Sequence, residues 1–161
     1  MKQHCKGKLK FTRTEKVVAA LPFNVCILIG AYGLYLTSWM LTAAYLAFAY
    51  IGVIVMMRYV MCPRCPHLLV GNDCLNLPAP LVKRLIDKSR SGPLNAREKL
   101  LHRVVKYGML VIPLYWLLPH LGLLIPFVAL YFLGQATFAL HLCKHCENEV
   151  CLQHRKASCR H

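Results

Sequence analysis

Nine cysteines are the residues of this chain best suited to chemistry, and six of them fall into two similar groups. Each group is a Cys-x-x-Cys pair followed by a third cysteine, separated from the pair by eight residues in the first group and by four in the second. The groups are Cys62, Cys65 and Cys74 in the middle of the chain and Cys143, Cys146 and Cys151 near its end. A Cys-x-x-Cys turn lets two thiolates converge on one ion, and two such turns supply the four soft ligands that zinc or a single iron ion prefers.

We therefore predict a metal site that joins the two groups. Its preferred ligands are Cys62, Cys65, Cys143 and Cys146, with Cys74 and Cys151 next in line. Further ligands could come from three histidines, namely His67, His145 and His154. The predicted ion is zinc or iron. Six thiolates would also suit an iron–sulfur cluster, although neither spacing matches the ferredoxin runs.

The first pair lies in the segment Cys62-Pro63-Arg64-Cys65-Pro66, which resembles the knuckles of zinc ribbons and rubredoxins over five residues. The second pair, Cys143-Lys144-His145-Cys146, is a looser match. The resemblance implies a tetrahedral thiolate site and covers no other part of the chain. Arg64 and Lys144 would offset the negative charge of such a site.

The elements that must position these cysteines are long apolar runs. Hydrophobic residues make up 57% of the chain and charged residues only 16%, below the ~25% that is typical of soluble domains. Three uncharged runs reach or approach the ~20 residues that cross a bilayer; they cover residues 17–36, 39–57 and 121–140. A fourth run, 104–118, is interrupted by Pro113 and spans only if Lys106 extends to the interface. We predict an all-α, polytopic membrane protein with four transmembrane helices arranged as two hairpins.

Charge predicts how these helices are oriented. All 20 Lys and Arg residues lie in 1–16, 58–106 or 142–161, and none lies in the short connections 37–38 and 119–122. Lys and Arg are retained on the cytosolic side during insertion. We therefore expect a multi-pass protein of the cell (inner) membrane with both termini in the cytosol, facing an anionic inner leaflet. This accounts for the net charge of +14 without a nucleic-acid partner.

The predicted organisation has five parts. They are a basic cytosolic tail (1–16), a first transmembrane hairpin (17–57), a cytosolic loop with the first cysteine group and an amphipathic helix (58–103), a second hairpin (104–141) and a Cys/His-rich cytosolic tail (142–161).

Smaller features refine this plan. Leu81, Val82, Leu85 and Ile86 share one helical face, which predicts a helix in the headgroup plane. This helix is either a simple connector or, with the rest of 78–103, a docking surface for a soluble or membrane protein partner. Asn95 followed by Glu98 predicts the start of the next helix.

Inside the spans, two kinds of small or polar residue carry a structural expectation. Gly30 and Gly33 predict close helix packing, and the amides of Asn24 and Gln135 predict hydrogen bonds between helices. Cys26 in the first span is the one intramembrane thiol, and it could relay a soft metal ion toward the cytosolic cysteines.

The sequence favours a metal-binding membrane protein that handles or senses a soft or borderline metal, or that anchors a metal-dependent complex. One alternative is an iron–sulfur or rubredoxin-like electron-transfer subunit. Another is a membrane thiol–disulfide oxidoreductase, since Cys-Pro-x-Cys also occurs in such active sites. Free or palmitoylated cysteines would need no paired spacing. The chain has no phosphate-binding loop, no HExxH and no acidic residue within a span, which argues against conventional hydrolase or transferase chemistry.

Overall fold

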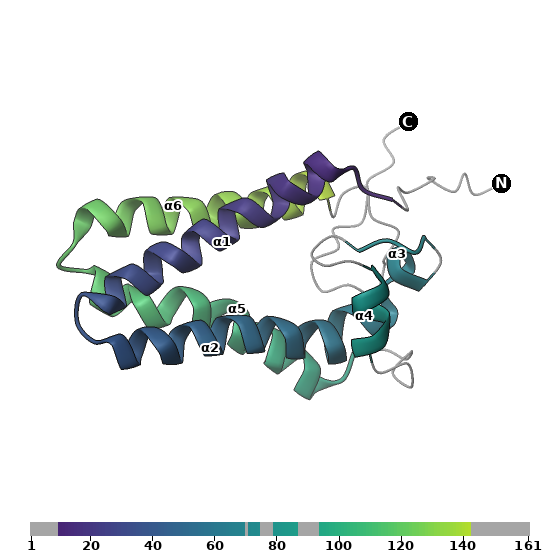
Figure 1. Cartoon of the computed structure of the whole chain (residues 1–161), viewed down its shortest axis with the longest axis horizontal. Helices are drawn as coiled ribbons and strands as arrows, with labels where there is room; N and C mark the ends of the chain where they lie inside the picture. Colours follow the sequence, from purple (N-terminus) through teal and green to yellow (C-terminus); the bar gives the residue numbers. More distant parts are fainter. Residues whose placement is uncertain (1–9, 70, 75–78, 87–93, 143–161) are drawn as a thin grey trace.

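The computed structural model describes residues 10–69, 71–74, 79–86 and 94–142, and the secondary structure in these segments is helical, with no strand (Figure 1). The long helices are α1 (Arg13–Tyr35), α2 (Trp39–Met56), α5 (Ala96–Leu117) and α6 (Leu121–Thr137). The shorter ones are η1 (Met57–Met61), η2 (Cys62–Arg64), α3 (Pro66–Leu69), α4 (Ala79–Leu85) and η3 (Phe138–Leu142). Because η1 and η2 follow α2 without a break, and η3 follows α6, two of the long helices are extended.

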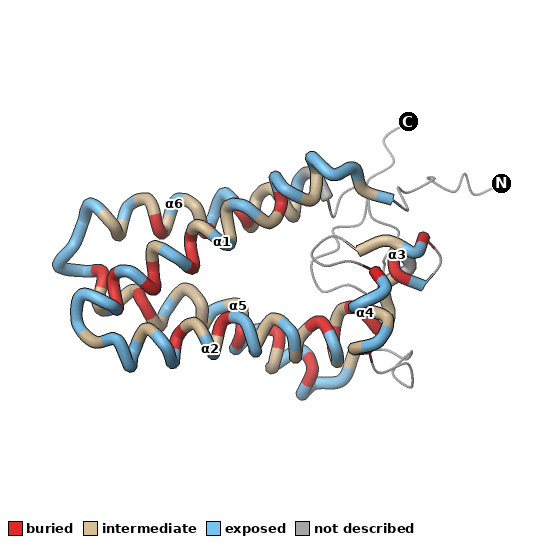
Figure 2. Tube along the Cα trace, in the orientation of Figure 1, coloured by how far each residue is buried: buried red, intermediate tan, exposed pale blue. Residues whose placement is uncertain are grey.

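Three of the described helices are long and apolar enough to cross a membrane: α1, α2 with its extension to Arg64, and α6 to Leu140. These correspond to the three uncharged runs of the sequence. Many of their large apolar side chains are exposed (Figure 2), as expected where lipid rather than water surrounds a helix. By length and composition, these three helices indicate a helical membrane protein. Helix α5 has 22 residues, but its charged first half excludes it from this group, so the fourth crossing stays a prediction.

The starts of α1 and α5 are fixed by the same local arrangement. At α1, the Glu15 amide donates to Thr12 Oγ1 at 3.3 Å, and the Thr12 amide donates to Glu15 Oε2 at 2.8 Å. At α5, the Asn95 amide donates to Glu98 Oε2 at 2.9 Å, and the reciprocal bond is also present. Such capping boxes satisfy amides that have no partner within a helix. The predicted start of the helix at Asn95 is confirmed.

The connections between the long helices divide the molecule into two ends. Residues 36–38 join α1 to α2 and residues 118–120 join α5 to α6, and both connections lie at one end, which we call the turn end (Figure 1). The start of α1, the end of α2 and the end of α6 lie at the opposite end, which we call the basic end. Helix α1 packs against α2, α5 and α6, and α5 also contacts α2 and α6.

Glycines allow the helices to approach closely. A β-carbon on Gly33 would lie 2.4 Å from Cδ2 of Leu117, and one on Gly30 would lie 3.1 Å from Cγ of Pro113. Both glycines are on α1 and both neighbours are on α5. The predicted role of Gly30 and Gly33 in close packing is confirmed. Without a hydrophobic driving force between helices in lipid, such contacts hold a bundle together.

One interior hydrogen bond compensates for a proline. Pro113 has no amide hydrogen, so the carbonyl four residues earlier, that of Met109, lacks its usual donor. The hydroxyl of Tyr45 on α2 donates to this oxygen at 3.0 Å. The expectation for the amide of Asn24 was wrong, because Asn24 Nδ2 donates to Ala20 O of its own helix at 2.8 Å. The interhelical bond near it comes instead from Cys26 Sγ, which lies 3.5 Å from Phe127 O.

Candidate metal centre at the basic end

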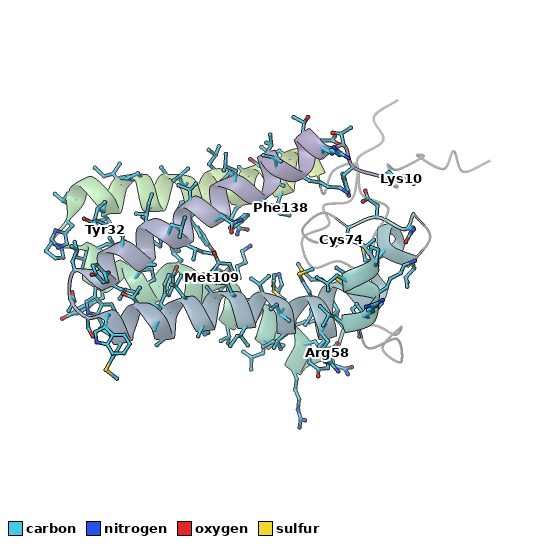
Figure 3. The ribbon with its side chains drawn as sticks, viewed as in Figure 1. Lys10, Tyr32, Arg58, Cys74, Met109 and Phe138 are labelled. Carbon is cyan, nitrogen blue, oxygen red and sulfur yellow. The ribbon has the colours of Figure 1, made fainter. Side chains whose placement is uncertain are left out.

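The first cysteine group is brought together where α2 ends. Cys62 begins η2, and the Cys65 amide donates to Cys62 O at 3.2 Å, which closes the Cys-x-x-Cys turn. Cys62, Cys65 and Cys74 belong to one side-chain cluster, although Cys74 comes from a separate segment. The Cys62 and Cys74 side chains are hydrogen-bonded. Figure 3 shows Cys74 at the basic end, far from Tyr32 near the turn end.

The cluster around these thiols is apolar, and all three cysteines are free thiols. Met57, Leu68 and Val82 are buried beside Cys62. Across the residues that the structure describes, no group of three or more Cys, His, Asp or Glu is arranged to hold a metal ion. The first group is thus assembled as three neighbouring thiols, two of which are hydrogen-bonded to each other.

The second cysteine group lies outside the described residues, as do His145 and His154; the side chain of His67 is also not described. The last described element is η3, which ends at Leu142, the residue before Cys143. Helix α6 and η3 run to the basic end, where η2 also lies (Figure 1). The joined site of Cys62, Cys65, Cys143 and Cys146 therefore stays a prediction.

Arg64, between the paired cysteines, has a partner that the sequence interpretation did not assign to it. Its Nη2 lies 3.2 Å from Oε1 and 3.1 Å from Oε2 of Glu98, and each side chain is only 6% exposed. Arg64 Nη1 also donates to the carbonyls of Tyr59 and Val60, both at 3.3 Å. The guanidinium joins the Cys-x-x-Cys turn to the start of α5. The sequence predicted only one role for Glu98, as a helix cap, because its spacing from Asn95 is that of a capping box.

Asp73 fixes the segment that carries Cys74. Its carboxylate accepts hydrogen bonds from the Phe11 amide at 2.9 Å, from the Cys74 amide at 3.0 Å and from Lys16 Nζ. Partial burial by itself would raise the pKa of Asp73, but the bonds from Lys16 and from the two amides outweigh it, so the pKa lies below its usual value. Its negative charge ties the segment to the start of α1. No sequence motif marks it.

The amphipathic segment at 81–86 has its apolar residues divided between two environments. Val82 lies in α4, and Ile86 is the first residue after this helix. Both are buried in the cluster that contains Cys62, whereas Leu81 is exposed. The predicted helix is present as α4, and its place in the headgroup plane stays a prediction. Helix α4 packs on the end of α2, because Met57 and Cys62 offer an apolar surface there.

The fold and these contacts define the class: a multi-helix membrane protein with a cluster of thiols at its basic end. No protein-family model, curated protein or solved structure matches this chain.

Proposed function

We propose that this chain is an integral protein of the cell (inner) membrane that binds a soft or borderline metal ion at its basic end, on the cytosolic side. It would handle or sense that metal, or anchor a metal-dependent complex. The observation that carries the proposal is the packing of Cys62, Cys65 and Cys74 in one cluster at the end of α2. This is also the end of the molecule to which α6 and η3 lead.

The proposed topology has four crossings, and the surface of α5 supports the fourth. Large apolar side chains are exposed along one face of α5 at intervals of three or four residues: Leu100, Val104, Tyr107, Val111, Tyr115 and Leu118. At 1.5 Å per residue this stripe is about 27 Å long, which matches the ~30 Å hydrocarbon core. The opposite face packs on the bundle through Val105, Pro113 and Leu117. Charged residues lower the average hydropathy of α5, but they all lie in the first half of the helix.

The charge distribution supports the proposed orientation. The turn end contains no Lys or Arg in its two connections, and the basic end contains the ends of the charged segments. The positive-inside rule places such segments in the cytosol. Arg58 lies over the Tyr59 ring at 5.2 Å from the ring centre. Aromatic and basic residues together are typical of the membrane–water boundary.

In the proposed site, Cys62 and Cys65 bind the ion together with Cys143 and Cys146. Binding would replace the hydrogen bond between Cys62 and Cys74 by bonds to the ion, and the thiol protons would pass to water. Cytosolic thiols are kept reduced, which leaves them available as ligands. Zinc or iron is the expected ion, since a tetrahedral thiolate set suits both. The alternative of an iron–sulfur or rubredoxin-like electron-transfer centre uses the same ligands.

A thiol–disulfide oxidoreductase is the second candidate, and one observation favours it. The hydrogen-bonded side chains of Cys62 and Cys74 are neighbours in a cluster that also contains Cys65. Loss of two electrons and two protons from two of these thiols to a soluble disulfide would form one disulfide in this chain and two thiols in the other molecule. Such exchange proceeds by thiolate attack through a mixed disulfide.

The test is to purify the full chain anaerobically in detergent and to measure its metal content and absorption spectrum. We expect about one zinc or iron ion per chain in the tetrahedral four-thiolate site. Cys62→Ser and Cys65→Ser should each lose most of this metal. Cys26→Ser is the matched control, because Cys26 is buried in the bundle against Phe127, and it should keep the metal.

The other results of this experiment discriminate among the candidates. Visible absorption that bleaches on reduction would assign the site to electron transfer. A metal-free protein with a reversible disulfide between cysteines of the first group would assign it to thiol exchange. Metal that stays bound in Cys62→Ser and Cys65→Ser to the same extent as in Cys26→Ser would refute the proposed ligands.

A further inference from the structure

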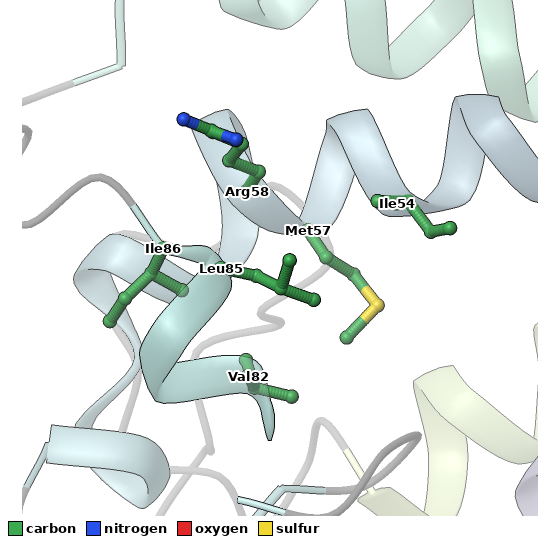
Figure 4. Close-up of a pocket in the computed structure, with 6 residues that line it drawn as sticks. All are labelled: Ile54, Met57, Arg58, Val82, Leu85 and Ile86. Atoms are coloured by element: carbon green, nitrogen blue, oxygen red, sulfur yellow. The ribbon is translucent and has the colours of Figure 1, made fainter. Parts of the chain in front are cut away.

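A shallow crevice lies between the end of α2 and helix α4 (Figure 4). The residues that line it are Ile54, Met57, Arg58, Val82, Leu85 and Ile86. In Figure 4 the Met57 and Leu85 side chains lie next to each other, and Arg58 lies at the margin with its guanidinium directed away from them. The lining is therefore apolar with one positive charge at its edge.

The crevice follows the last turn of α2 and the first residues of η1. Ile54 is one helical turn nearer the middle of α2 than Arg58, and its side chain is exposed. Arg58 is exposed beside the Tyr59 ring, at the depth where aromatic side chains meet headgroups. A ligand in this crevice would have its apolar part beside Ile54 and its polar part beside Arg58.

Among the residues that the structure describes, no carboxylate forms an ion pair with the charge at the edge of the crevice. The ion pairs of the described residues join Lys16 to Asp73 and Arg64 to Glu98, and neither involves Arg58. Helix α4 contributes Lys83 and Arg84 and has no acidic residue in the sequence of its seven positions. Arg58 thus differs from Arg64, which is buried and paired. Its guanidinium is free to bind a phosphate through two N–H groups.

We propose that this crevice binds one anionic phospholipid of the inner leaflet, with an acyl chain against Ile54 and Leu85 and the phosphate at Arg58. The proposal rests on the membrane orientation described above and is independent of whether the cysteines bind metal. Met57, Val82 and Ile86 line the crevice and also belong to the cluster around Cys62. A bound lipid would therefore stabilise the packing of α4 against the thiol cluster.

The experiment is native mass spectrometry of the full chain in detergent, titrated with phosphatidylglycerol or with phosphatidylcholine of the same acyl chains. We expect tighter binding of one phosphatidylglycerol, and Arg58→Gln should weaken it about fivefold, since one basic residue near a surface contributes ~1 kcal/mol. Arg97→Gln is the matched control. Arg97 is exposed at the start of α5 and does not line the crevice, so this substitution removes the same charge at a different place. It should change the affinity less than twofold.

A second pair of variants tests the apolar part of the crevice. Ile54→Trp fills it and should weaken both lipids, whereas Ile51→Trp, one turn away and also exposed, should weaken neither. Equal effects of Arg58→Gln and Arg97→Gln would overturn the proposal, since the attraction would then be a general surface charge. A dimer that Ile54→Trp converts to a monomer would also overturn it, with a second copy as the occupant. Metal content measured on the same samples reports separately on the cysteine site.

Discussion

Around Gly33, α1 and α5 meet with no room for a side chain, whereas at the basic end α2 and α5 are joined through the buried pair of Arg64 and Glu98. The bundle interior depends on shape, because lipid and side chains are equally apolar and only close contact favours association. The basic end depends on a few charged groups that join segments distant in the sequence. The thiol cluster lies in this second region, so its geometry rests on few interactions.

Hydrogen bonds also serve different purposes in the two regions. In the interior, Tyr45 supplies the donor that Pro113 lacks, and the bond restores what a regular helix would have. At the basic end, Asp73 gathers the Phe11 amide, the Cys74 amide and Lys16 and so determines where a cysteine lies. We therefore expect that mutations at the basic end can change the thiol cluster and leave the long helices intact.

The largest expected effect is that of Glu98→Gln. Glutamine keeps the helix cap at Asn95 but leaves the buried Arg64 without a counter-charge, which costs about 3 kcal/mol of unfolding free energy. Chemical denaturation in detergent would measure this loss. The double variant Arg64→Met with Glu98→Gln should recover most of it, because the cap is kept and no buried charge is left unpaired. A double variant as unstable as Glu98→Gln would contradict this view of the basic end.

Gly33→Val is expected to have the largest effect in the bundle interior. The β-carbon would meet the Leu117 side chain, which is fully buried, so either this side chain or the two helices must shift. Overpacking of this kind costs about 2 kcal/mol. Gly122→Val is the control, since no atom lies within 4 Å of a β-carbon there. Thermal unfolding of the two variants in the same detergent would compare them. Similar melting temperatures would show that close approach does not hold the bundle together.

Tyr45→Phe should cost about 1–2 kcal/mol of unfolding free energy, because it leaves the Met109 carbonyl without a donor. Tyr131→Phe should cost less: Tyr131 donates to Lys106 O at 3.0 Å, and that carbonyl also has the Leu110 amide of a regular helix as a donor. Adding Pro113→Ala to Tyr45→Phe restores an amide donor and should recover part of the loss. Equal costs for the two tyrosines would argue against the role assigned to Pro113.

The smallest expected effect is the pH dependence contributed by Asp73. Its pKa is lowered in the folded protein, so its stabilisation is complete above the unfolded value of about 3.9 and is lost as the pH falls through the folded pKa. The stability difference between the wild type and Asp73→Asn should therefore be constant above about pH 5 and shrink below it. Lys16 is 31% exposed, which limits the difference to about 1 kcal/mol. A difference that grows on acidification would contradict the assignment.

Much of the fold could be predicted from local patterns. The uncharged runs predicted α1, α2 and α6, the pair Asn95 and Glu98 predicted where α5 begins, and Gly33 predicted a close contact. Each of these depends on residues within a few helical turns. The partner of Arg64 could not be predicted, because Glu98 is 34 positions away and had a sufficient local role. Asp73 was missed for the same reason, since its partner Lys16 is 57 positions away.

By itself, the sequence determined that the chain is helical, that three of its segments suit a bilayer and that its two Cys-x-x-Cys pairs are the candidate metal ligands. These properties follow from hydropathy, backbone capping and the spacing of neighbours, which are local. Only the tertiary structure decided that the Cys74 and Cys62 side chains are hydrogen-bonded, that Glu98 neutralises Arg64 and that α4 packs against the thiol cluster. Such contacts arise where distant segments meet, and burial makes them selective: a charge or thiol removed from water must find its partner within the fold.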